Sequence, residues 1–541
     1  MLNLGNLLTQ TAHLYPDRTG LVKGRERWTW WQLEQSANGL ARALLELGIG
    51  PGDRVLAQGP NSRWMLEAQY AVMRTGAIHI PVNPRAIPRE SAQMAKLSGA
   101  KALIMDTSLA ANAALASGSH DGLRHVITTA PVAESSRGSG RAVWHVYDEL
   151  AMRHAGETVA HAAKEDDVCF QMYTAGTTGV PKGAFHSQRS LLAGLIGRIA
   201  DVMPGVDKHC ALLAIGPLSH GTGTTCTICV MRGAKIVMLE GARFDVGDCW
   251  RLIEEERISE IFTVPTMLID LARHPEAKLR DRSSLRHVVY AGAPINRAEQ
   301  KEALEMFGAS LVQYYGSTEN MGTATVLYPS MHSMADDDPE CPVGTCGVAR
   351  SGVNIEIRSP DGKALPAGET GEIWIHGPGN FLGYQDMPEA TAQTLKNGWV
   401  NAGDLGRMDE RGFVYIVGRS REMYKSGGFQ VYPNETQNYL TEHPAVAEAH
   451  IVSFPDSRWG EIGVAVVQLL SGHTATETEL REFLRARMAA YKLPRRFWFW
   501  EQIPRSAVGK VPKALLREEI LRRGLVKEGQ DIPPVLGAGE G

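Results

Sequence analysis

The chain has 541 residues, more than a single hydrophobic core holds, so its length predicts about two to four domains. Hydrophobic residues make up 43% and charged residues 21%, a balance that is typical of a globular protein and excludes a largely disordered one. The net charge of −4 is spread along the chain, which disfavours nucleic acid and anionic membrane surfaces as partners, so small-molecule chemistry is the expected function class.

The N-terminal stretch lacks the basic region and apolar core of a secretory signal, and the apolar runs are too short to span a bilayer. We therefore expect a cytoplasmic protein with no integral membrane segment. Seven cysteines, an odd number, fit reduced thiols. Cys226 and Cys229 have the spacing of metal and redox sites, but their stretch is apolar and lacks a second pair at ligand spacing. Buried small side chains are the favoured interpretation.

Helices and short apolar strands alternate through the first 330 residues or so. Thr29 and Gln32 have the spacing of a capping box, and apolar residues follow at helical intervals as far as Gly48, which predicts a helix. A strand at 54–58 comes next, and a further helix and strand end at Val82. Similar buried strands are predicted at residues 102–105, 168–173, 211–215, 235–239, 261–264 and 287–290. The alternation implies mostly parallel sheets covered on both faces, in two similar α/β units.

The pattern changes after Met334, where turn signals separate short alternating runs. Strands at 354–358 and 372–376 predict a small β-rich subdomain. A last unit begins near Arg419 and combines a strand at 464–469 with a helix at 477–489. Residues 131–141, rich in Ser and Gly, are expected to form a surface loop, and the tail from Gly524 is expected to be poorly ordered.

Residues 174–183 have the composition of a phosphate-binding loop. Three glycines let backbone N–H groups approach an anion, three threonines add hydroxyl donors, and Lys182 supplies a positive charge. The strand before the loop places it at a sheet edge, where α/β proteins bind ligands. Pro181 and Gly183 flank the lysine and disfavour a Walker A loop. A mobile Gly/Thr-rich turn remains the alternative for this stretch taken alone.

Six stretches follow one another in the order and spacing of a known superfamily. They are residues 173–183, 291–294, 313–319, 398–406, 418–419 and 509–510. Together they resemble the adenylate-forming superfamily of acyl-CoA synthetases, aryl-CoA ligases, luciferases and peptide-synthetase adenylation domains, and the resemblance runs from about residue 5 to residue 520.

The resemblance implies an α/β fold with a large N-terminal AMP-binding domain and a small mobile α+β domain. The large domain would be residues 1–418, with αβαβα-type subdomains at 1–170 and 171–334 and a β-barrel-like subdomain at 335–418. Residues 419–421 would form a hinge that contains Arg421, and residues 422–541 the C-terminal domain. The implied activity is that of an ATP-dependent acid–CoA ligase, with Mg²⁺, ATP, CoA and a fatty or aromatic carboxylic acid as cofactor and substrates. A homodimer stays open.

The same resemblance assigns roles in ATP binding. The β- and γ-phosphate cradle would be Thr174, Gly176, Thr177, Thr178, Gly179 and Lys182. Glu319 would hold Mg²⁺, and Thr318 would contact the α-phosphate. The adenine site would consist of Gly292, Ala293, Pro294, Tyr315 and Gly316, because small residues and an aromatic face enclose a planar base. Asp404 would accept hydrogen bonds from the ribose hydroxyls, helped by Arg419.

The resemblance also assigns residues to catalysis and to the acyl and CoA sites. Lys510 matches the adenylation lysine, which bridges the carboxylate and the α-phosphate, whereas Lys513 is expected to be solvated. The pantetheine tunnel would be formed by Ser426, Gly427 and Gly428. The acyl pocket would be formed by His220, Gly221, Ala291 and Gly316, where small residues leave room for a ring or a medium chain. Lys425 and Gln430 look like the versions found in plant hydroxycinnamate ligases and luciferases, which hints at an aromatic acid. The resemblance places Lys425 among the catalytic residues and Gln430 among the ATP-binding residues.

Three positions depart from the family pattern. Ala175 replaces a serine and removes one phosphate-facing hydroxyl, a loss of roughly 1 kcal/mol in ATP binding. Glu422 replaces the more usual Asp, and Gln437 replaces an acidic residue. An acyl-AMP ligase that loads a carrier protein, a luciferase-like oxygenase and a non-catalytic nucleotide-binding protein remain as alternatives. Intact Lys182, Glu319, Asp404 and Lys510 argue against the last of these.

Overall fold

A computed structural model describes most of the chain. The described residues are 3–159, 161–174, 181–241, 243–419, 422–426, 429–457, 459–505, 511–526 and 532. They divide into two compact units. The N-terminal unit comprises Met1–Ile295, Glu299–Ile355 and Ile375–Ala402, and the C-terminal unit comprises Asn296–Ala298, Glu356–Trp374 and Gly403–Gly541. Over the described ranges, no helix is both long enough and apolar enough to cross a membrane.

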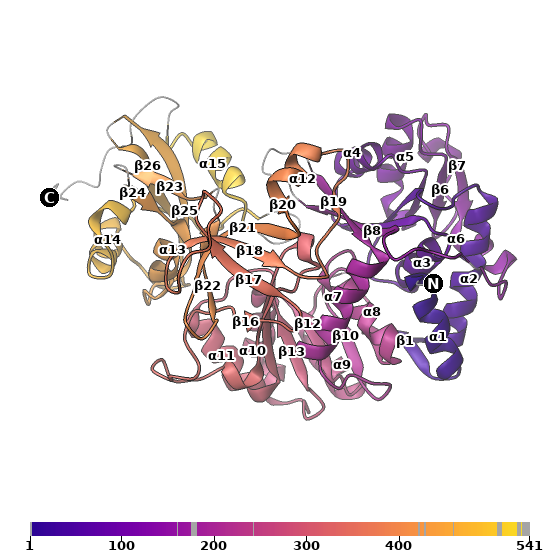
Figure 1. Cartoon of the computed structure of the whole chain (residues 1–541), viewed down its shortest axis with the longest axis horizontal. Coiled ribbons are helices and arrows are strands. Elements are labelled where there is room, and N and C mark those ends of the chain that lie inside the picture. The colour runs from indigo at the N-terminus through magenta and orange to yellow at the C-terminus, as the bar shows by residue number, and fades with distance from the viewer. Residues whose placement is uncertain are drawn as a thin grey trace. The chain divides into compact units, whose positions relative to one another are not determined.

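The larger sheet of the N-terminal unit has nine strands. Its strands β16, β13, β12, β10 and β1 are labelled in Figure 1. Their order is β16 (Val348–Ala349), β15 (Thr325–Leu327), β14 (Leu311–Tyr315), β13 (His287–Tyr290), β12 (Glu260–Thr263), β10 (Ala211–Ala214), β11 (Lys235–Met238), β1 (Thr19–Lys23) and β2 (Glu26–Thr29). The central strands from β14 to β1 run parallel, and the outer pairs are antiparallel. The N-terminal hairpin β1–β2 therefore joins a sheet that is otherwise built from residues beyond 210.

The second sheet has eight strands. Their order is β19 (Gly383–Tyr384), β9 (Lys182–Ser187), β8 (Val168–Thr174), β4 (Ile78–Val82), β3 (Arg54–Gln58), β5 (Ala102–Met105), β6 (His125–Thr128) and β7 (Val143–Val146). The strands from β8 to β7 are parallel, and β9 and β19 add an antiparallel edge. All the buried strands predicted before residue 330 are present within a residue or two of their predicted ends.

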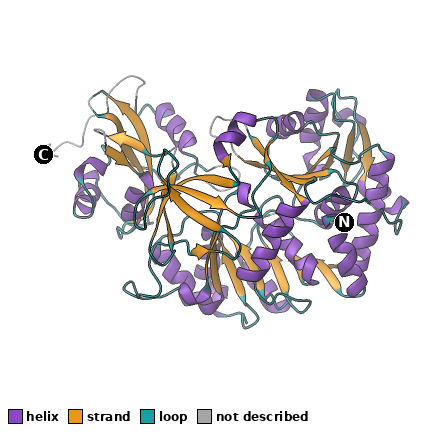
Figure 2. Cartoon of the chain, in the orientation of Figure 1, coloured by secondary structure: helices purple, strands orange, loops and turns teal. Residues whose placement is uncertain are grey.

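Helices flank both sheets (Figure 2). The α-helices are α1 (Leu7–Leu14), α2 (Trp30–Glu46), α3 (Arg63–Arg74), α4 (Pro88–Ser98), α5 (Ala110–Ser119), α6 (Tyr147–Arg153), α7 (Gln188–Asp201), α8 (Gly221–Arg232), α9 (Val246–Glu255), α10 (Pro265–Arg273), α11 (Arg297–Phe307), α12 (Pro388–Thr394), α13 (Pro433–Thr441), α14 (Glu477–Arg485) and α15 (Lys513–Arg522). Short 3₁₀ turns are η1 (Leu4–Asn6), η2 (Thr107–Leu109), η3 (Glu134–Ser136), η4 (Pro275–Lys278), η5 (Gly308–Ser310), η6 (Thr318–Asn320), η7 (Pro329–Met331) and η8 (Ala490–Lys492). The predicted surface loop at 131–141 contains η3.

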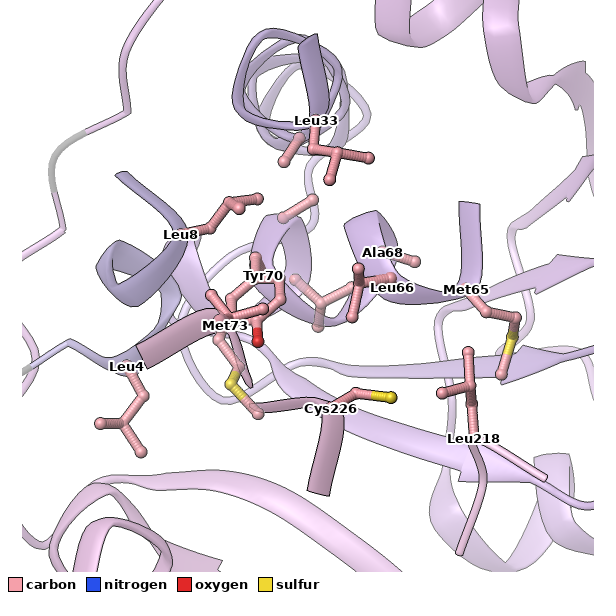
Figure 3. Close-up of a cluster of buried hydrophobic side chains, with 14 of the residues drawn as sticks. Leu4, Leu8, Leu33, Met65, Leu66, Ala68, Tyr70, Met73, Leu218 and Cys226 are labelled. Carbon is pink, nitrogen blue, oxygen red and sulfur yellow. The ribbon is translucent and has the colours of Figure 1, made fainter. Parts of the chain in front are cut away.

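Both faces of the parallel strands are buried, as the alternation of elements predicts. On β10, Leu212 belongs to the core cluster that contains α2, α3 and α8, whereas Leu213 faces the cluster that contains Trp250 of α9. Figure 3 shows Leu33, Tyr70 and Cys226 converging from α2, α3 and α8 in the first cluster. This helical layer is shared by the two sheets, because strands of both contribute side chains to it. The favoured interpretation of Cys226 and Cys229 as buried small side chains is confirmed.

Two helix predictions have different outcomes. Helix α2 begins at the predicted capping box, in which Thr29 accepts from the Gln32 backbone and Gln32 from the Thr29 backbone. The helix expected at 477–489 is too long, because α14 ends at Arg485. Its buried face ends with Leu484, and the chain then turns so that Met488 packs against the same cluster from outside the helix.

A third sheet contains the two β-strands predicted after Met334. Its order is β17 (Asn354–Arg358), β18 (Gly371–His376), β21 (Trp399–Met408) and β20 (Leu395–Lys396), with β22 (Val414–Arg419) paired to β21. The division between the two units falls within β17, β18 and β21.

The C-terminal unit also contains a separate mixed sheet. Its order is β24 (Phe429–Val431), β23 (Tyr424–Ser426), β26 (Gly460–Leu469) and β25 (Val446–Asp456), with β27 (Phe497–Phe499) parallel to β26. Two clusters of buried side chains cover its faces, one with α13 and α14 and the other with α15. Most of the tail predicted from Gly524 lies outside the described residues.

Candidate active site

Lys182 begins the strand that returns from the predicted phosphate loop. Strands β8 and β9 are antiparallel, and Thr174 and Lys182 are cross-strand partners at the end of the pair. These two residues therefore lie side by side where the strand pair ends, at the carboxyl end of β8. Gly176, Thr177, Thr178 and Gly179, together with the departure at Ala175, lie outside the described residues.

Glu319 lies in a short turn that follows the carboxyl end of β14. Tyr315 is the last residue of that strand, and Thr318 is the first residue of η6. The turn is held locally, because the Ser317 N–H donates to Asn320 Oδ1 at 3.1 Å. A Cβ at Gly316 would lie 2.4 Å from the Gly322 backbone, so only glycine permits this tight fold. The glycine at 316 is therefore required by backbone packing.

Tyr384 joins Lys182 to Glu319, a contact that the sequence analysis did not predict. The Tyr384 hydroxyl donates to Glu319 Oε1 at 2.5 Å, and Lys182 Nζ lies 5.0 Å from the centre of the Tyr384 ring. Tyr384 is on β19, which pairs with β9 through Tyr384 and Ala184. A cation and a carboxylate from distant segments thereby contact one aromatic side chain, the cation at its ring and the carboxylate at its hydroxyl.

The segment predicted to bind adenine lies at the same edge of the nine-stranded sheet as the Glu319 turn. Residues 291–294 follow β13, and β13 runs parallel to β14 with Tyr290 opposite Gln313. Gly292 has φ of +84°, and it is exposed together with Ala293 and Pro294, while Ala291 is buried. The exposed segment and Tyr315 thus lie at adjacent strand ends, where parallel sheets bind ligands.

The predicted acyl segment begins α8. His220 is the exposed N-cap residue, and its Nδ1 lies 2.9 Å from Ser219 Oγ. A Cβ at Gly221 would lie 2.6 Å from the Phe262 ring, so the room expected at this glycine is filled on that side by an aromatic ring. Phe262 stacks on Tyr314 with ring centres 5.9 Å apart and planes 12° apart. Phe262 was predicted only as part of a strand, because its contact with α8 depends on tertiary packing.

A buried arginine, Arg198, contacts the Tyr314 ring of this aromatic pair. The Arg198 guanidinium is 5.0 Å from the Tyr314 ring centre, and its Nε donates to Thr323 Oγ1 at 2.8 Å. It also donates to Thr224 Oγ1 at 2.5 Å and to the Met321 carbonyl at 2.9 Å. Arg198 therefore connects α7, α8 and the segment that follows the Glu319 turn.

Two titratable side chains beside the phosphate loop are held neutral. Burial raises the pKa of Tyr173 to about 12. Burial lowers the pKa of His186 to about 4, against the opposing effect of the Thr318 backbone nearby. His186 lies on the same strand as Lys182. Lys182 therefore supplies a positive charge at the start of β9, and the neutral His186 adds none four residues further along the strand.

Asp404 and Arg419 form a direct ion pair in the C-terminal unit. They are cross-strand partners on β21 and β22, with Arg419 Nε 2.8 Å from Asp404 Oδ1. The Asp404 side chain is 6% exposed and the Arg419 side chain 57% exposed. The resemblance assigned both residues to one ribose site. In the structure, Arg419 contacts the carboxylate of Asp404 and so fixes its orientation.

Further predicted site residues belong to the C-terminal unit. Lys510, Arg421, Gly427 and Gly428 lie outside the described residues. Lys425 and Gln430 are cross-strand partners in the hairpin β23–β24, and Ser426, which is buried, ends the first strand of that hairpin.

Lys513 is a correction to the sequence analysis, which expected it to be solvated. Its side chain is only 19% exposed, and its Nζ lies 3.0 Å from Glu422 Oε2. Burial lowers the pKa of Lys513, and the neighbouring Glu422 carboxylate opposes this effect. The sequence could not reveal this pair, because the two residues meet only when α15 packs against the segment before β23. Gln437, the other departure in this unit, accepts a hydrogen bond from the Ile451 N–H at 3.0 Å.

The fold and the grouped side chains define a class of protein. A lysine, a carboxylate and an exposed glycine-containing segment gather at the carboxyl edges of parallel strands, which is the arrangement of a nucleotide-binding α/β enzyme. Residues 8–385 match the family described as "AMP-binding enzyme", and residues 435–510 match the "AMP-binding enzyme C-terminal domain". The chain therefore belongs to the adenylate-forming superfamily of AMP-binding enzymes, as the order of its motifs predicted.

Named relatives cover nearly the whole chain. A feruloyl-CoA synthase of an Amycolatopsis species is 32% identical over 95% of this chain and 98% of its own length. A long-chain-fatty-acid–CoA ligase of Mycobacterium tuberculosis is 31% identical over 96% of this chain and 99% of its own length. Among solved structures, the amide bond synthetase McbA from Marinactinospora thermotolerans matches with a TM-score of 0.84 and 28% identity, over 95% of this chain and 99% of that chain.

Proposed function

We propose that this chain is an ATP-dependent acid–CoA ligase that acts through an acyl-adenylate. In the first half-reaction a carboxylate oxygen attacks the α-phosphorus of ATP, the bond from the α-phosphorus to the bridging oxygen breaks, and pyrophosphate leaves. In the second half-reaction the CoA thiolate attacks the acyl carbon and AMP leaves, which forms the thioester. Both reactants of the first step are anions, so positioning and charge neutralisation must carry most of the catalysis.

One observation carries this proposal: Lys182 and Glu319 both contact Tyr384, Lys182 at its ring and Glu319 at its hydroxyl. A lysine at the base of a glycine-rich loop suits the departing pyrophosphate, because its compact positive charge neutralises phosphate oxygens. The exposed segment 291–294 at the neighbouring strand end suits a planar base. Together they provide separate places for the two ends of ATP.

The residues at this edge fit a magnesium ion. Glu319 accepts one hydrogen bond on Oε1, and a single carboxylate together with substrate phosphates is how proteins commonly hold Mg²⁺. When bound, the ion would neutralise charge on the phosphates. Glu319 would hold it, while Thr318 at the start of the same turn would contact the α-phosphate.

The remaining roles follow from the order of the motifs. Asp404 would bind the ribose hydroxyls, with Arg419 orienting it through their ion pair. Lys510 would approach the α-phosphate during adenylation. Rotation about Arg421 would then move Lys510 away from the nucleotide and bring the CoA tunnel at 426–428 to the acyl-adenylate. Lys425 and Gln430 would act from the hairpin that contains Ser426.

An aromatic acid is the substrate class that the side chains around the predicted acyl segment favour. The stacked rings of Phe262 and Tyr314 lie beside Gly221, at the start of the predicted acyl segment. Aromatic walls favour a planar ring through offset or edge-to-face contacts. Relatives named for feruloyl-CoA and for long-chain fatty acids are about equally similar to the chain, so the distinction rests on these two side chains.

The decisive experiment measures acid-dependent ATP–pyrophosphate exchange with a panel of carboxylic acids. We expect benzoates and cinnamates to support faster exchange than medium-chain fatty acids, and the opposite order would reject the aromatic assignment. Lys510→Ala should abolish exchange yet still convert supplied acyl-adenylate to thioester. Lys363→Ala changes an exposed lysine whose partner is Asp361, and it serves as the matched control. Normal exchange in Lys510→Ala would reject its role.

The acyl acceptor is tested in the second half-reaction. Gly428→Leu should narrow the tunnel, so that exchange persists while thioester formation with CoA falls; normal thioester formation would count against the tunnel. Replacing CoA with a phosphopantetheinylated carrier protein tests the carrier-loading alternative, which faster transfer to the carrier would favour.

A further inference from the structure

We propose that Tyr384 is a positioning residue that holds Lys182 and Glu319 in place for the triphosphate and its Mg²⁺. This inference rests on the proposed function, because it concerns the nucleotide of that reaction. Tyr384 acts through its two neighbours: its ring faces the cation and its hydroxyl binds the carboxylate.

The ring of Tyr384 restricts the lysine. Lys182 Nζ lies 5.0 Å from the ring centre, within the range of a cation–π contact. A lysine side chain has many rotamers, and an aromatic face limits them without occupying the three N–H donors. The donors of Lys182 therefore remain able to bind phosphate oxygens.

The hydroxyl of Tyr384 orients the carboxylate. It donates to Glu319 Oε1 at 2.5 Å, which fixes the carboxylate plane and leaves Oε2 for a metal ion. Carboxylate ligands of metals are commonly held by such a neighbouring donor. Within the described part of the chain, neither Lys182 nor Glu319 forms an ion pair. Each contacts Tyr384 instead, so the charge of each stays available to a ligand.

The backbone around Tyr384 is fixed to both neighbours, so the side chain has little freedom to move. The Phe381 N–H donates to the Glu319 carbonyl at 2.7 Å, and the Gln385 N–H donates to the Gly183 carbonyl at 2.9 Å. Residues 381–385 therefore bridge the Glu319 turn and strand β9. Phe381 also packs edge-on against the Tyr384 ring, with centres 4.9 Å apart.

The test measures nucleotide binding by calorimetry on the full chain, with ATP in EDTA and with MgATP. Tyr384→Phe keeps the ring beside Lys182 and removes only the hydroxyl. We expect its affinity for MgATP to fall roughly tenfold, while its affinity for ATP in EDTA stays within about twofold of wild type. Tyr384→Leu also removes the ring, so its affinity for ATP in EDTA should fall by about threefold.

The matched control is Tyr415→Phe, which removes a tyrosine hydroxyl that donates to Asp409 at 3.1 Å. Its affinities should equal those of wild type. If Tyr384→Phe binds MgATP like wild type, or loses affinity equally with and without Mg²⁺, the positioning role is wrong. If Tyr384→Leu fails to fold, the phenylalanine variant alone decides. A wild type that binds MgATP but supports no exchange with any acid would reject the proposed reaction and leave the role of Tyr384 to be judged from binding.

Discussion

Charged side chains are arranged differently in two regions of this molecule. In the N-terminal unit, Lys182 and Glu319 each contact Tyr384, and within the described residues they form no ion pair with each other. In the C-terminal unit, Asp404 contacts Arg419 directly and Glu422 contacts Lys513 directly. Charges that are held apart keep donors and lone pairs for a ligand, whereas charges in contact neutralise each other and fix the chain. The first arrangement suits phosphate and metal binding, and the second suits orientation and stability.

The largest effect is expected from Glu319→Gln. The amide has the same shape, and its carbonyl oxygen still accepts from Tyr384, so the fold should persist. The metal would lose its anionic ligand, and we expect exchange to fall on the order of 100-fold, about 3 kcal/mol of barrier. Asp409→Asn alters the carboxylate of another tyrosine–carboxylate pair, with Tyr415, and should leave exchange unchanged. Near-normal exchange in Glu319→Gln would show that the carboxylate held by Tyr384 does not serve metal binding.

A pH-dependent loss of stability is expected at His186, behind Lys182. Its pKa is about 4 in the folded chain and 6.5 ordinarily, so the unfolded chain binds the proton more tightly. Stability is therefore full above about pH 6.5 and is lost as the pH falls toward 4. By pH 5 the loss is roughly 2 kcal/mol.

Urea unfolding at pH 7 and pH 5 measures this loss. His186→Leu should lose roughly 2 kcal/mol less than wild type between these pH values. His473→Gln alters an exposed histidine and should behave as wild type. If the free energy of unfolding of His186→Leu depends on pH as that of wild type does, burial does not keep His186 neutral in the folded chain.

A smaller effect is expected from Lys513→Met, which removes a direct ion pair. Glu422 is 35% exposed, so water partly replaces the lost partner and the cost should be about 1 kcal/mol. The midpoint of thermal unfolding should fall by about 2–4 °C. Arg485→Met breaks a more exposed pair with Glu482 and should change little. A loss of exchange without a loss of stability would place Lys513 in the active machinery instead.

The smallest effect is expected from Arg419→Lys. The substitution keeps the charge beside Asp404 and removes the planar fork of the guanidinium. Because Arg419 is mostly exposed, the KM for ATP in the exchange reaction should rise only about twofold. A rise of tenfold or more would mean that Arg419 contacts the nucleotide itself, and the description of this pair as an orienting contact would fail.

Local patterns in the sequence predicted the elements and the class of site. The capping box at Thr29, the apolar strand 287–290 and the β-strand 354–358 are present at their predicted residues. These features depend on dihedral preferences and on periodic burial, which act over a few residues. The order of the six motifs likewise indicated the superfamily to which the chain belongs. The roles of Lys182, Glu319 and Lys510 stay predictions.

The tertiary structure alone decided which distant side chains meet. Tyr384 contacts Glu319 across 65 positions of sequence, because β19 adds to the edge of a sheet built from earlier strands. Lys513 is partly buried against Glu422, and Phe262 fills the space beside Gly221, for the same kind of reason. Burial and contact between segments depend on how whole layers pack, and a single sequence contains no local signal for that packing. The charged residues could thus be named from the sequence. Only the folded chain shows that Lys182 and Glu319 both contact Tyr384, whereas Asp404 and Glu422 form direct ion pairs.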